Sequence, residues 1–258
     1  MTNFFQKSKK DLISIIAGAS LFLNVACMQN KNISQIYELP IQQEIDIEEN
    51  KILYDVINQT LGEFKEYDLI KEIDFYNDRI LWGYVDGDST LQNFTLGLNK
   101  YSALKKDKTP TNNFIYTLIH EQGHLISLNS NQVTPYYDAD ICPTLELPEG
   151  CLKQNSYLYD FYKEFWQDEH AQKNYLENNT NSLKFNIFHF KNRKNFLNAN
   201  ASTNITEDFA ESFTHYVLDI SVNEKHKSYQ KITFFDKYDD LKDMKERIQQ
   251  NLSKFIEK

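Results

Sequence analysis

One short segment, Thr117–Ile126, constrains this chain more than any other, because it sets two histidines four residues apart in an apolar run. His120 and His124 flank Glu121 in the pattern His-Glu-x-x-His. Residues four apart lie one turn above each other on a helix, so both imidazoles can face the same metal ion. Glu121 lies beside them, in the place of a carboxylate that takes a proton from water on the metal. The pattern predicts a buried helix with one zinc ion; the plainer alternative is two histidines on one helix face without a metal.

A catalytic zinc site uses three protein ligands and keeps a fourth position open, so a third ligand is needed. No histidine follows at the spacing of the HExxHxxGxxH pattern. The segment 206–216 is the better source, because Glu207 and Glu211 share one face of the helix it predicts, with His215 next along that face. The alternative reading is an amphipathic helix whose acidic face is solvated.

These two motifs together carry a family resemblance. The residues His120–His124 and the run Glu-Asp-Phe-Ala-Glu-Ser-Phe that starts at Glu207 resemble gluzincin-type metallopeptidases related to the anthrax lethal factor catalytic domain, and bacterial secreted and lipid-anchored zincin-like proteins. The resemblance implies that Glu207 is the third zinc ligand. It also implies that Glu211, and with it Asp208, is an outer carboxylate that orients a ligating histidine. His215 remains the alternative third ligand.

The resemblance implies a zinc metallopeptidase that acts on peptides or proteins. Zinc held by His120, His124 and Glu207 would activate a water molecule, and Glu121 would act as the general base. A peptide substrate is expected to pair with the edge of a strand near the site. The segment Phe94–Leu98 is the candidate strand, with an ordinary core strand as the equal alternative.

Asn200 departs from the family pattern. Families of this type often carry a tyrosine seven residues before the ligand glutamate, where Asn200 stands in this sequence. An asparagine amide can donate a hydrogen bond to an oxyanion but cannot act as an acid. The departure motivates a second hypothesis, a zincin-fold binding lipoprotein with weak or no hydrolytic activity.

The N-terminal segment 1–26 has the order of a bacterial lipoprotein signal. Basic residues within Lys7–Lys10 precede the apolar run Leu12–Leu23, and a small residue stands before Cys27. We expect lipidation of Cys27 and anchoring to the cell envelope, facing the periplasm or the cell surface. The alternatives are an ordinary secretory signal or a plain N-terminal anchor. Residues 27–49 are expected to form a polar tether.

Cys142 and Cys151 are the remaining cysteines, nine positions apart with two prolines between them. Export to an oxidising compartment favours a disulfide between them. The alternative is a pair of free thiols. Their spacing is not the short CxxC spacing of a structural zinc site.

Composition limits the fold class of the 258-residue chain. Only 7 Gly and 5 Pro occur, which argues against turn-dense all-β folds, and a net charge of -9 argues against a nucleic-acid binder. The order of patterns predicts one α+β domain over residues 50–258, with a small N-terminal mixed sheet, the active-site helix and a mostly helical C-terminal part. Expected strands are 73–76, 80–85 and 94–99; expected helices are 50–65, 110–129, 156–170, 205–221 and 235–257; loops are expected at 131–156 and 170–195.

Overall fold

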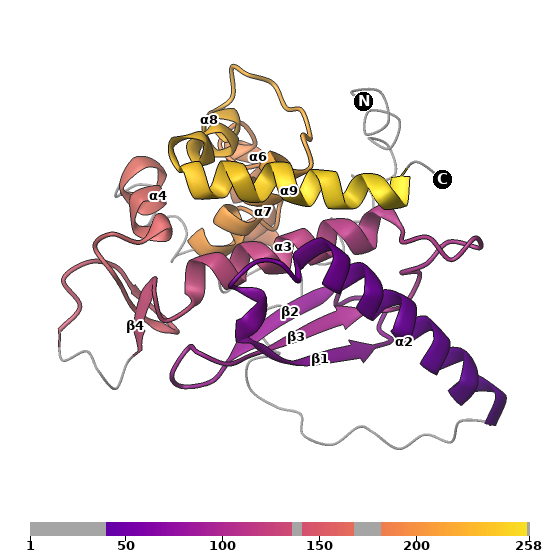
Figure 1. Ribbon diagram of the computed structural model, residues 1–258. Coiled ribbons are helices and arrows are strands. Elements are labelled where there is room, and N and C mark those ends of the chain that lie inside the picture. The colour runs from indigo at the N-terminus through magenta and orange to yellow at the C-terminus, as the bar shows by residue number, and fades with distance from the viewer. Residues whose placement is uncertain (1–39, 136–140, 168–181, 257–258) are drawn as a thin grey trace.

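The computed structural model describes residues 40–135, 141–167 and 182–256 (Figure 1). The elements, in chain order, are α2 (Pro40–Leu61), η2 (Tyr67–Leu69), β1 (Ile70–Tyr76), β2 (Gly83–Gly87), β3 (Phe94–Asn99), α3 (Asn112–Leu128), β4 (Val133–Pro135), β5 (Glu146–Leu147), β6 (Gly150–Leu152), α4 (Tyr157–Phe165), α6 (Ser182–Asn192), α7 (Ile205–Val217), α8 (Lys227–Thr233), η4 (Phe234–Lys237) and α9 (Asp239–Ile256). The expected signal segment, Cys27 and the first part of the tether lie outside the described residues. None of the described helices is long and apolar enough to cross a membrane.

The first sheet is mixed and has the strand order β1-β3-β2, with β3 parallel to β1 and antiparallel to β2. Leu96 and Leu98 of β3 are fully buried, as expected for a strand paired on both sides. The prediction that Phe94–Leu98 offers an edge to a peptide is therefore wrong, and its core-strand alternative is confirmed. Among the described strands, β1 and β2 form the edges of this sheet.

Helix α3 lies between the sheet and the C-terminal helices, as Figure 1 shows. Thr111 caps the helix, because its side chain accepts a hydrogen bond from the Phe114 backbone N–H. Leu118 and Ile119 are fully buried. The helix therefore has apolar contacts over most of its circumference, as its sequence predicts, and holds its polar residues within the core.

The helical predictions differ from the structure mainly at their ends. Helix α2 begins at Pro40, so the last part of the expected 27–49 tether is helical, and proline is well suited to the first turn of a helix. Helix α4 ends at Phe165, before the predicted end at residue 170. Helix α9 starts at Asp239 after the short turn η4. Helices α6 and α8 were not predicted, and α6 falls in the expected 170–195 loop.

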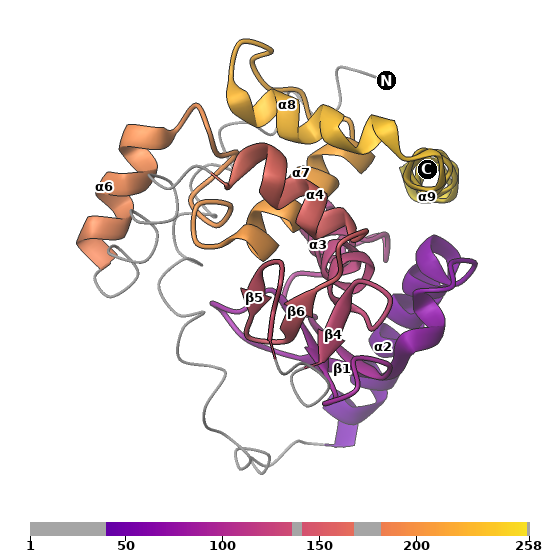
Figure 2. The same ribbon diagram turned by 90° about the vertical axis from the view of Figure 1, so that its left-hand side faces the viewer.

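A second sheet, with the order β4-β6-β5, occupies part of the region expected to be a loop at 131–156. Figure 2 shows its three strands together, below α4. Cys142 and Cys151 form a disulfide with an S–S distance of 2.07 Å, which ties the start of this hairpin region to β6. Strands of two or three residues are too short to show a periodic pattern in the sequence.

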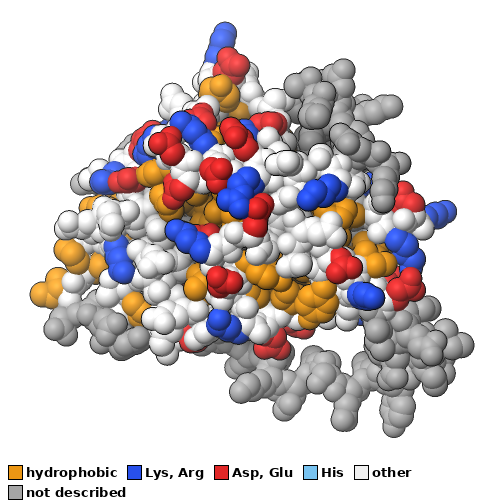
Figure 3. All heavy atoms as spheres, viewed as in Figure 1, with side chains coloured by type: hydrophobic (Ala, Val, Ile, Leu, Met, Phe, Trp, Pro, Cys, Tyr) orange, Lys and Arg blue, Asp and Glu red, His pale blue; other side chains and the backbone are white. Residues whose placement is uncertain are grey.

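The described part of the chain combines helices with two small sheets, a mixed composition compatible with the expected α+β class. The face seen in Figure 3 carries acidic and basic side chains interspersed with one another. This face has no continuous basic stripe of the kind that binds nucleic-acid phosphates.

Candidate metal centre

Helix α3 presents both histidines of the His-Glu-x-x-His pattern on one side. The Nε2 atoms of His120 and His124 lie 3.1 Å apart, and both residues are 8% exposed. The two rings are nearly perpendicular, with centroids 4.9 Å apart. The helical spacing therefore brings the two imidazole nitrogens to one point, as the sequence predicts.

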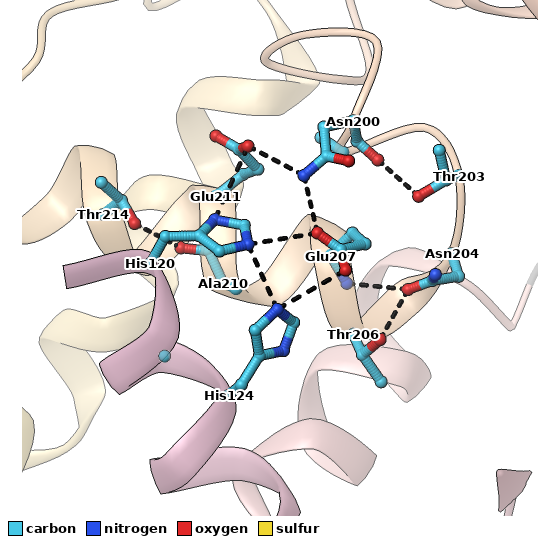
Figure 4. A network of polar contacts seen from close by, with 12 residues as sticks. His120, His124, Asn200, Thr203, Asn204, Thr206, Glu207, Ala210, Glu211 and Thr214 are labelled. Atoms are coloured by element: carbon cyan, nitrogen blue, oxygen red, sulfur yellow. Dashed lines mark hydrogen bonds and ion pairs between the residues drawn. The ribbon is translucent and has the colours of Figure 1, made fainter. Parts of the chain in front are cut away.

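Helix α7 supplies the third group. Asn204 caps its N-terminus, since its side chain accepts a hydrogen bond from the Glu207 backbone N–H at 2.8 Å. One turn of helix then directs the Glu207 carboxylate at the histidines (Figure 4): Oε2 lies 3.1 Å from Nε2 of His120, and Oε1 lies 3.5 Å from Nε2 of His124. His120, His124 and Glu207 thus form a group whose ligand atoms all lie within 4.8 Å of one another.

This donor set fits a metal ion. Two atoms on a tetrahedral zinc ion, each about 2.0–2.2 Å from it, lie about 3.3–3.6 Å apart. The three distances among His120, His124 and Glu207 are 3.1, 3.1 and 3.5 Å. The Nε2 atoms of both histidines face the shared point, whereas their Nδ1 atoms are buried and make no hydrogen bond. The group could hold one metal ion.

Glu211 lies behind His120, one helical turn beyond Glu207. Its Oε1 is 3.6 Å from Nδ1 of His120, and its Oε2 accepts a hydrogen bond from the Tyr116 hydroxyl. A carboxylate on the far nitrogen of a ligating histidine fixes the orientation and the tautomer of the ring. Glu211 lies near this nitrogen without a hydrogen bond to it, and its orienting role stays a prediction.

Asn200 bridges the two carboxylates of α7. Its Nδ2 donates to Oε2 of Glu207 at 2.6 Å and to Oε1 of Glu211 at 3.1 Å, as the dashed lines in Figure 4 show. Both amide hydrogens are therefore used within the protein. In this arrangement Asn200 has no free donor for an oxyanion, contrary to one role considered for it from the sequence.

The electrostatics of the group follow from burial and charge. Burial acts to lower the pKa of His120, but the carboxylates of Glu207 and Glu211 outweigh it and raise that pKa to about 10. Burial acts in turn to raise the pKa of Glu207, yet the charges and hydrogen bonds of both histidines hold it well below its ordinary value. The site is thus a preformed ion-pair cluster with Glu207 ionised.

Glu121 is buried on α3 beside the ligand group, with 4% of its surface exposed. Burial raises the pKa of its carboxyl, and the charges of His120 and His124 partly oppose that shift. Gly83 of β2 lies against it: a Cβ at Gly83 would come within 2.6 Å of Oε1 of Glu121. The lack of a side chain at Gly83 leaves space for this carboxylate between α3 and the sheet.

Two residues of the expected site lie elsewhere. Asp208, expected among the outer carboxylates that orient a ligand, binds Lys231 at 2.5 Å and accepts a hydrogen bond from Trp166 Nε1 at 2.7 Å. It follows Glu207 in sequence, so the helical rotation turns it to another face. His215, the alternative ligand, packs edge-on against Tyr116 and does not join the metal-binding group.

Two residues near the site were missed by sequence reasoning. Tyr116 precedes His120 by four residues, so the helical period that revealed the histidines would also have placed it on their face. Glu149 lies in the turn between β5 and β6; burial raises its pKa, while the charge of His124 opposes that shift. Nothing in the local sequence of Glu149 indicates this proximity.

The comparisons with known proteins give no relative for this chain: no protein-family model matches it, and no curated protein or solved structure shows significant similarity. The geometry of the site therefore carries the functional argument.

Proposed function

We propose that this protein is an exported zinc metallopeptidase of the zincin type, with one zinc ion held by His120, His124 and Glu207. The observation that carries the proposal is the convergence of three ligand atoms on one point, with the buried carboxylate of Glu121 beside them on the same helix. A site with three protein ligands leaves one position for water or substrate, as catalytic zinc sites do. A pure metal store would not require an acid–base group between two ligands.

The roles of the residues follow from their surroundings. When bound, zinc would supply a Lewis acid that polarises a peptide carbonyl and makes water more acidic. Glu121 would accept a proton from the attacking water and pass it to the amine nitrogen as the C–N bond breaks. Its raised pKa suits the first step, because burial makes this carboxylate a stronger base than a solvent-exposed one. Glu211 would hold the ring of His120 through Nδ1.

Strand β2 is the edge at which we propose that a peptide substrate binds. Among the described residues it is one of the two edge strands of the first sheet, and it is the one whose Gly83 lies against the Glu121 carboxylate. A peptide that adds a strand to β2 would run past the general base, with its backbone held by main-chain hydrogen bonds. The sequence placed this role on the neighbouring strand β3.

We also propose that the chain is anchored to the envelope through lipid on Cys27 after removal of residues 1–26. The order of basic segment, apolar run and cysteine supports this. Replacing Cys27→Ala should move the protein from the membrane fraction to the soluble fraction. Unchanged membrane partitioning of that variant would show that the anchor is wrong.

The substitution Glu121→Gln tests the catalytic proposal. We expect zinc affinity to stay at the wild-type level, because Glu121 is not a ligand, while cleavage of a mixed peptide library falls about 10²–10⁴-fold. His124→Ala is the contrasting variant and should lose both zinc and activity. Hydrolysis at the wild-type rate by a zinc-loaded Glu121→Gln protein would remove Glu121 from the mechanism.

A second candidate function is a zinc-binding lipoprotein of the same fold without hydrolytic activity. The observation that favours it is the use of both Asn200 hydrogens by carboxylates, which leaves that side chain no donor for a developing oxyanion. Zinc bound at one equivalent, with no cleavage of any peptide in the library, would select this alternative.

A further inference from the structure

Asn200 occupies a defined position in the loop before α7. Its backbone carbonyl accepts hydrogen bonds from the backbone N–H and the hydroxyl of Thr203, at 2.9 and 2.7 Å. The Asn198 side chain accepts from the Ala201 backbone N–H at 2.8 Å. The loop is thus fixed by its own turns, and the amide of Asn200 is directed at the carboxylates of α7 (Figure 4).

The amide belongs to a continuous chain of hydrogen bonds. Tyr116 donates to one oxygen of Glu211, and Asn200 donates to the other at 3.1 Å. The same nitrogen of Asn200 donates to Oε2 of Glu207 at 2.6 Å. This series of hydrogen bonds therefore reaches both sides of the group formed by His120, His124 and Glu207, since Glu211 lies behind His120 and Glu207 is the proposed third ligand.

An amide suits this position for a physical reason. Glu211 is buried and Glu207, one helical turn before it, is partly buried, and two like charges in a poorly hydrated site repel each other. A primary amide carries two hydrogens on one nitrogen and can donate to both oxygens at once, whereas a hydroxyl has only one. Hydrogen bonds to ionised groups are also stronger than neutral ones.

We propose that Asn200 is a positioning residue: its amide nitrogen holds Glu207 and Glu211 in one arrangement and thereby sets the metal affinity of the site. The inference rests on the proposed metal site and deepens it. It assigns Asn200 to the support of the ligands and not to contact with a substrate. Tyr116 stands at the other end of the same series of hydrogen bonds, where its hydroxyl donates to Glu211.

The test compares zinc affinity in Asn200→Ala and Asn200→Leu with the wild type, by competition with a chromophoric chelator. Leu keeps the branched shape and the number of side-chain heavy atoms of Asn but has no donor. Loss of an outer partner of a metal ligand costs about 10–100-fold in affinity, and we expect both variants in that range. The visible spectrum of the cobalt-substituted protein should change as well, because the Glu207 carboxylate is freed to move.

Asn99→Ala is the matched control. Asn99 also uses its amide nitrogen twice, donating to the backbone carbonyls of Asp78 and Leu81 at 2.6 Å each, but at the end of the first sheet. This control should lower the stability of the fold and leave the zinc affinity of the folded protein unchanged. An equal loss of zinc affinity in Asn99→Ala would mean that the effect of Asn200 is only structural.

Tyr116→Phe deletes one hydroxyl and keeps the result interpretable should the Asn200 variants fold poorly. We expect Tyr116→Phe to lose less zinc affinity than the Asn200 variants. The loss in the double variant Tyr116→Phe with Asn200→Ala should differ from the sum of the two single losses, because both side chains hold Glu211. Wild-type zinc affinity in the Asn200 variants would overturn the assignment. If the Asn200 variants lose zinc affinity as expected but the wild-type protein cleaves no peptide, the proposed peptidase activity is wrong and the role of Asn200 still holds.

Discussion

Gly123 of α3 lies directly against Ala210 of α7. A Cβ added to Gly123 would come within 2.9 Å of the Ala210 Cα and 3.2 Å of its Cβ. Glycine costs about 1 kcal/mol in a helix relative to alanine, and this close contact explains why glycine stands here. Gly123 directly precedes His124, and Ala210 lies three positions after Glu207. This contact therefore sets the distance between α3 and α7 at the level of His124 and Glu207.

We therefore expect Gly123→Ala to damage the site as well as the fold. The added methyl meets backbone, which cannot rotate away, so overpacking of about 1–3 kcal/mol should exceed the gain in helix propensity. Because the methyl group would push α3 and α7 apart, the substitution should also weaken zinc binding. Denaturant unfolding and a zinc competition titration measure the two effects. Asn113→Ala, in the first turn of α3, is the control and should leave zinc affinity unchanged.

The outcome for Gly123→Ala is decisive for the packing argument. A variant as stable as the wild type, with the same zinc affinity, would show that the two helices separate without consequence. A variant that loses stability but keeps zinc affinity would show that the contact supports the fold alone.

The buried ion pair between Asp208 and Lys231 gives a second prediction. Both side chains are at most 2% exposed, and their charged atoms lie 2.5 Å apart. Lys231→Met leaves the Asp208 charge buried without its partner, which should cost about 3–5 kcal/mol in the free energy of unfolding. The double variant with Asp208→Asn should recover most of this, since the neutral amide carries no charge and its oxygen can still accept the hydrogen bond from Trp166.

Lys242→Met supplies the exposed comparison. Lys242 pairs with Asp239 at 3.6 Å at the surface, where ion pairs contribute little. Chemical denaturation should distinguish the two lysines clearly. Equal effects of Lys231→Met and Lys242→Met would contradict the argument that burial makes the loss of Lys231 costly.

Sequence reasoning worked where the signal was local. The spacing of His120 and His124 predicts one helix face, and the strand expected at 94–99 corresponds to β3, because each pattern lies within a single element. Glu207 required the family resemblance, since 87 positions separate it from His120. The structure brings these residues together, as that resemblance implied.

The remaining contacts depend on tertiary packing that no local pattern records. Asp208 and Glu207 are neighbours in sequence, yet one meets Lys231 and the other meets His120. The hydrogen bond between Tyr116 and Glu211 joins two helices across 95 positions. The place of β3 inside the sheet depends on which strands pair with it, and hydrophobic alternation alone does not fix that order.

The disulfide between Cys142 and Cys151 gives a third prediction. Its loop is short, with a sequence separation of 9, for which loop-closure entropy gives a stabilisation of about 2–3 kcal/mol. Reduction, or the double variant Cys142→Ala with Cys151→Ala, should lower the free energy of unfolding by that amount. Zinc affinity should persist, because the ligands come from α3 and α7. A reductant should have no further effect on the double variant, and a large effect there would place the redox-sensitive group elsewhere.

The pH dependence of the metal-free protein gives the last prediction. The pKa of His120 is raised from an ordinary 6.5 to about 10, so the stability it contributes is complete below pH 6.5 and declines as the pH approaches 10. The pKa of Glu207 is lowered from 4.5, so its contribution is present above pH 4.5 and is lost in more acidic solution. These two groups together favour the metal-free fold most between about pH 4.5 and 6.5.

Bound zinc should oppose the loss of stability that the metal-free protein shows as the pH rises above about 6.5. The metal competes with the proton on Nε2 of His120, so zinc affinity rises with pH and the bound ion stabilises the fold more at about pH 8.5 than at about pH 6. Thermal unfolding with zinc and with a chelator, from about pH 5 to 8.5, measures both curves. The chelated protein should lose Tm above about pH 6.5, and His120→Asn should flatten that loss because an amide does not titrate. A chelated wild-type protein with a constant Tm from about pH 6.5 to 8.5 would contradict the ion pairing of His120 with Glu207.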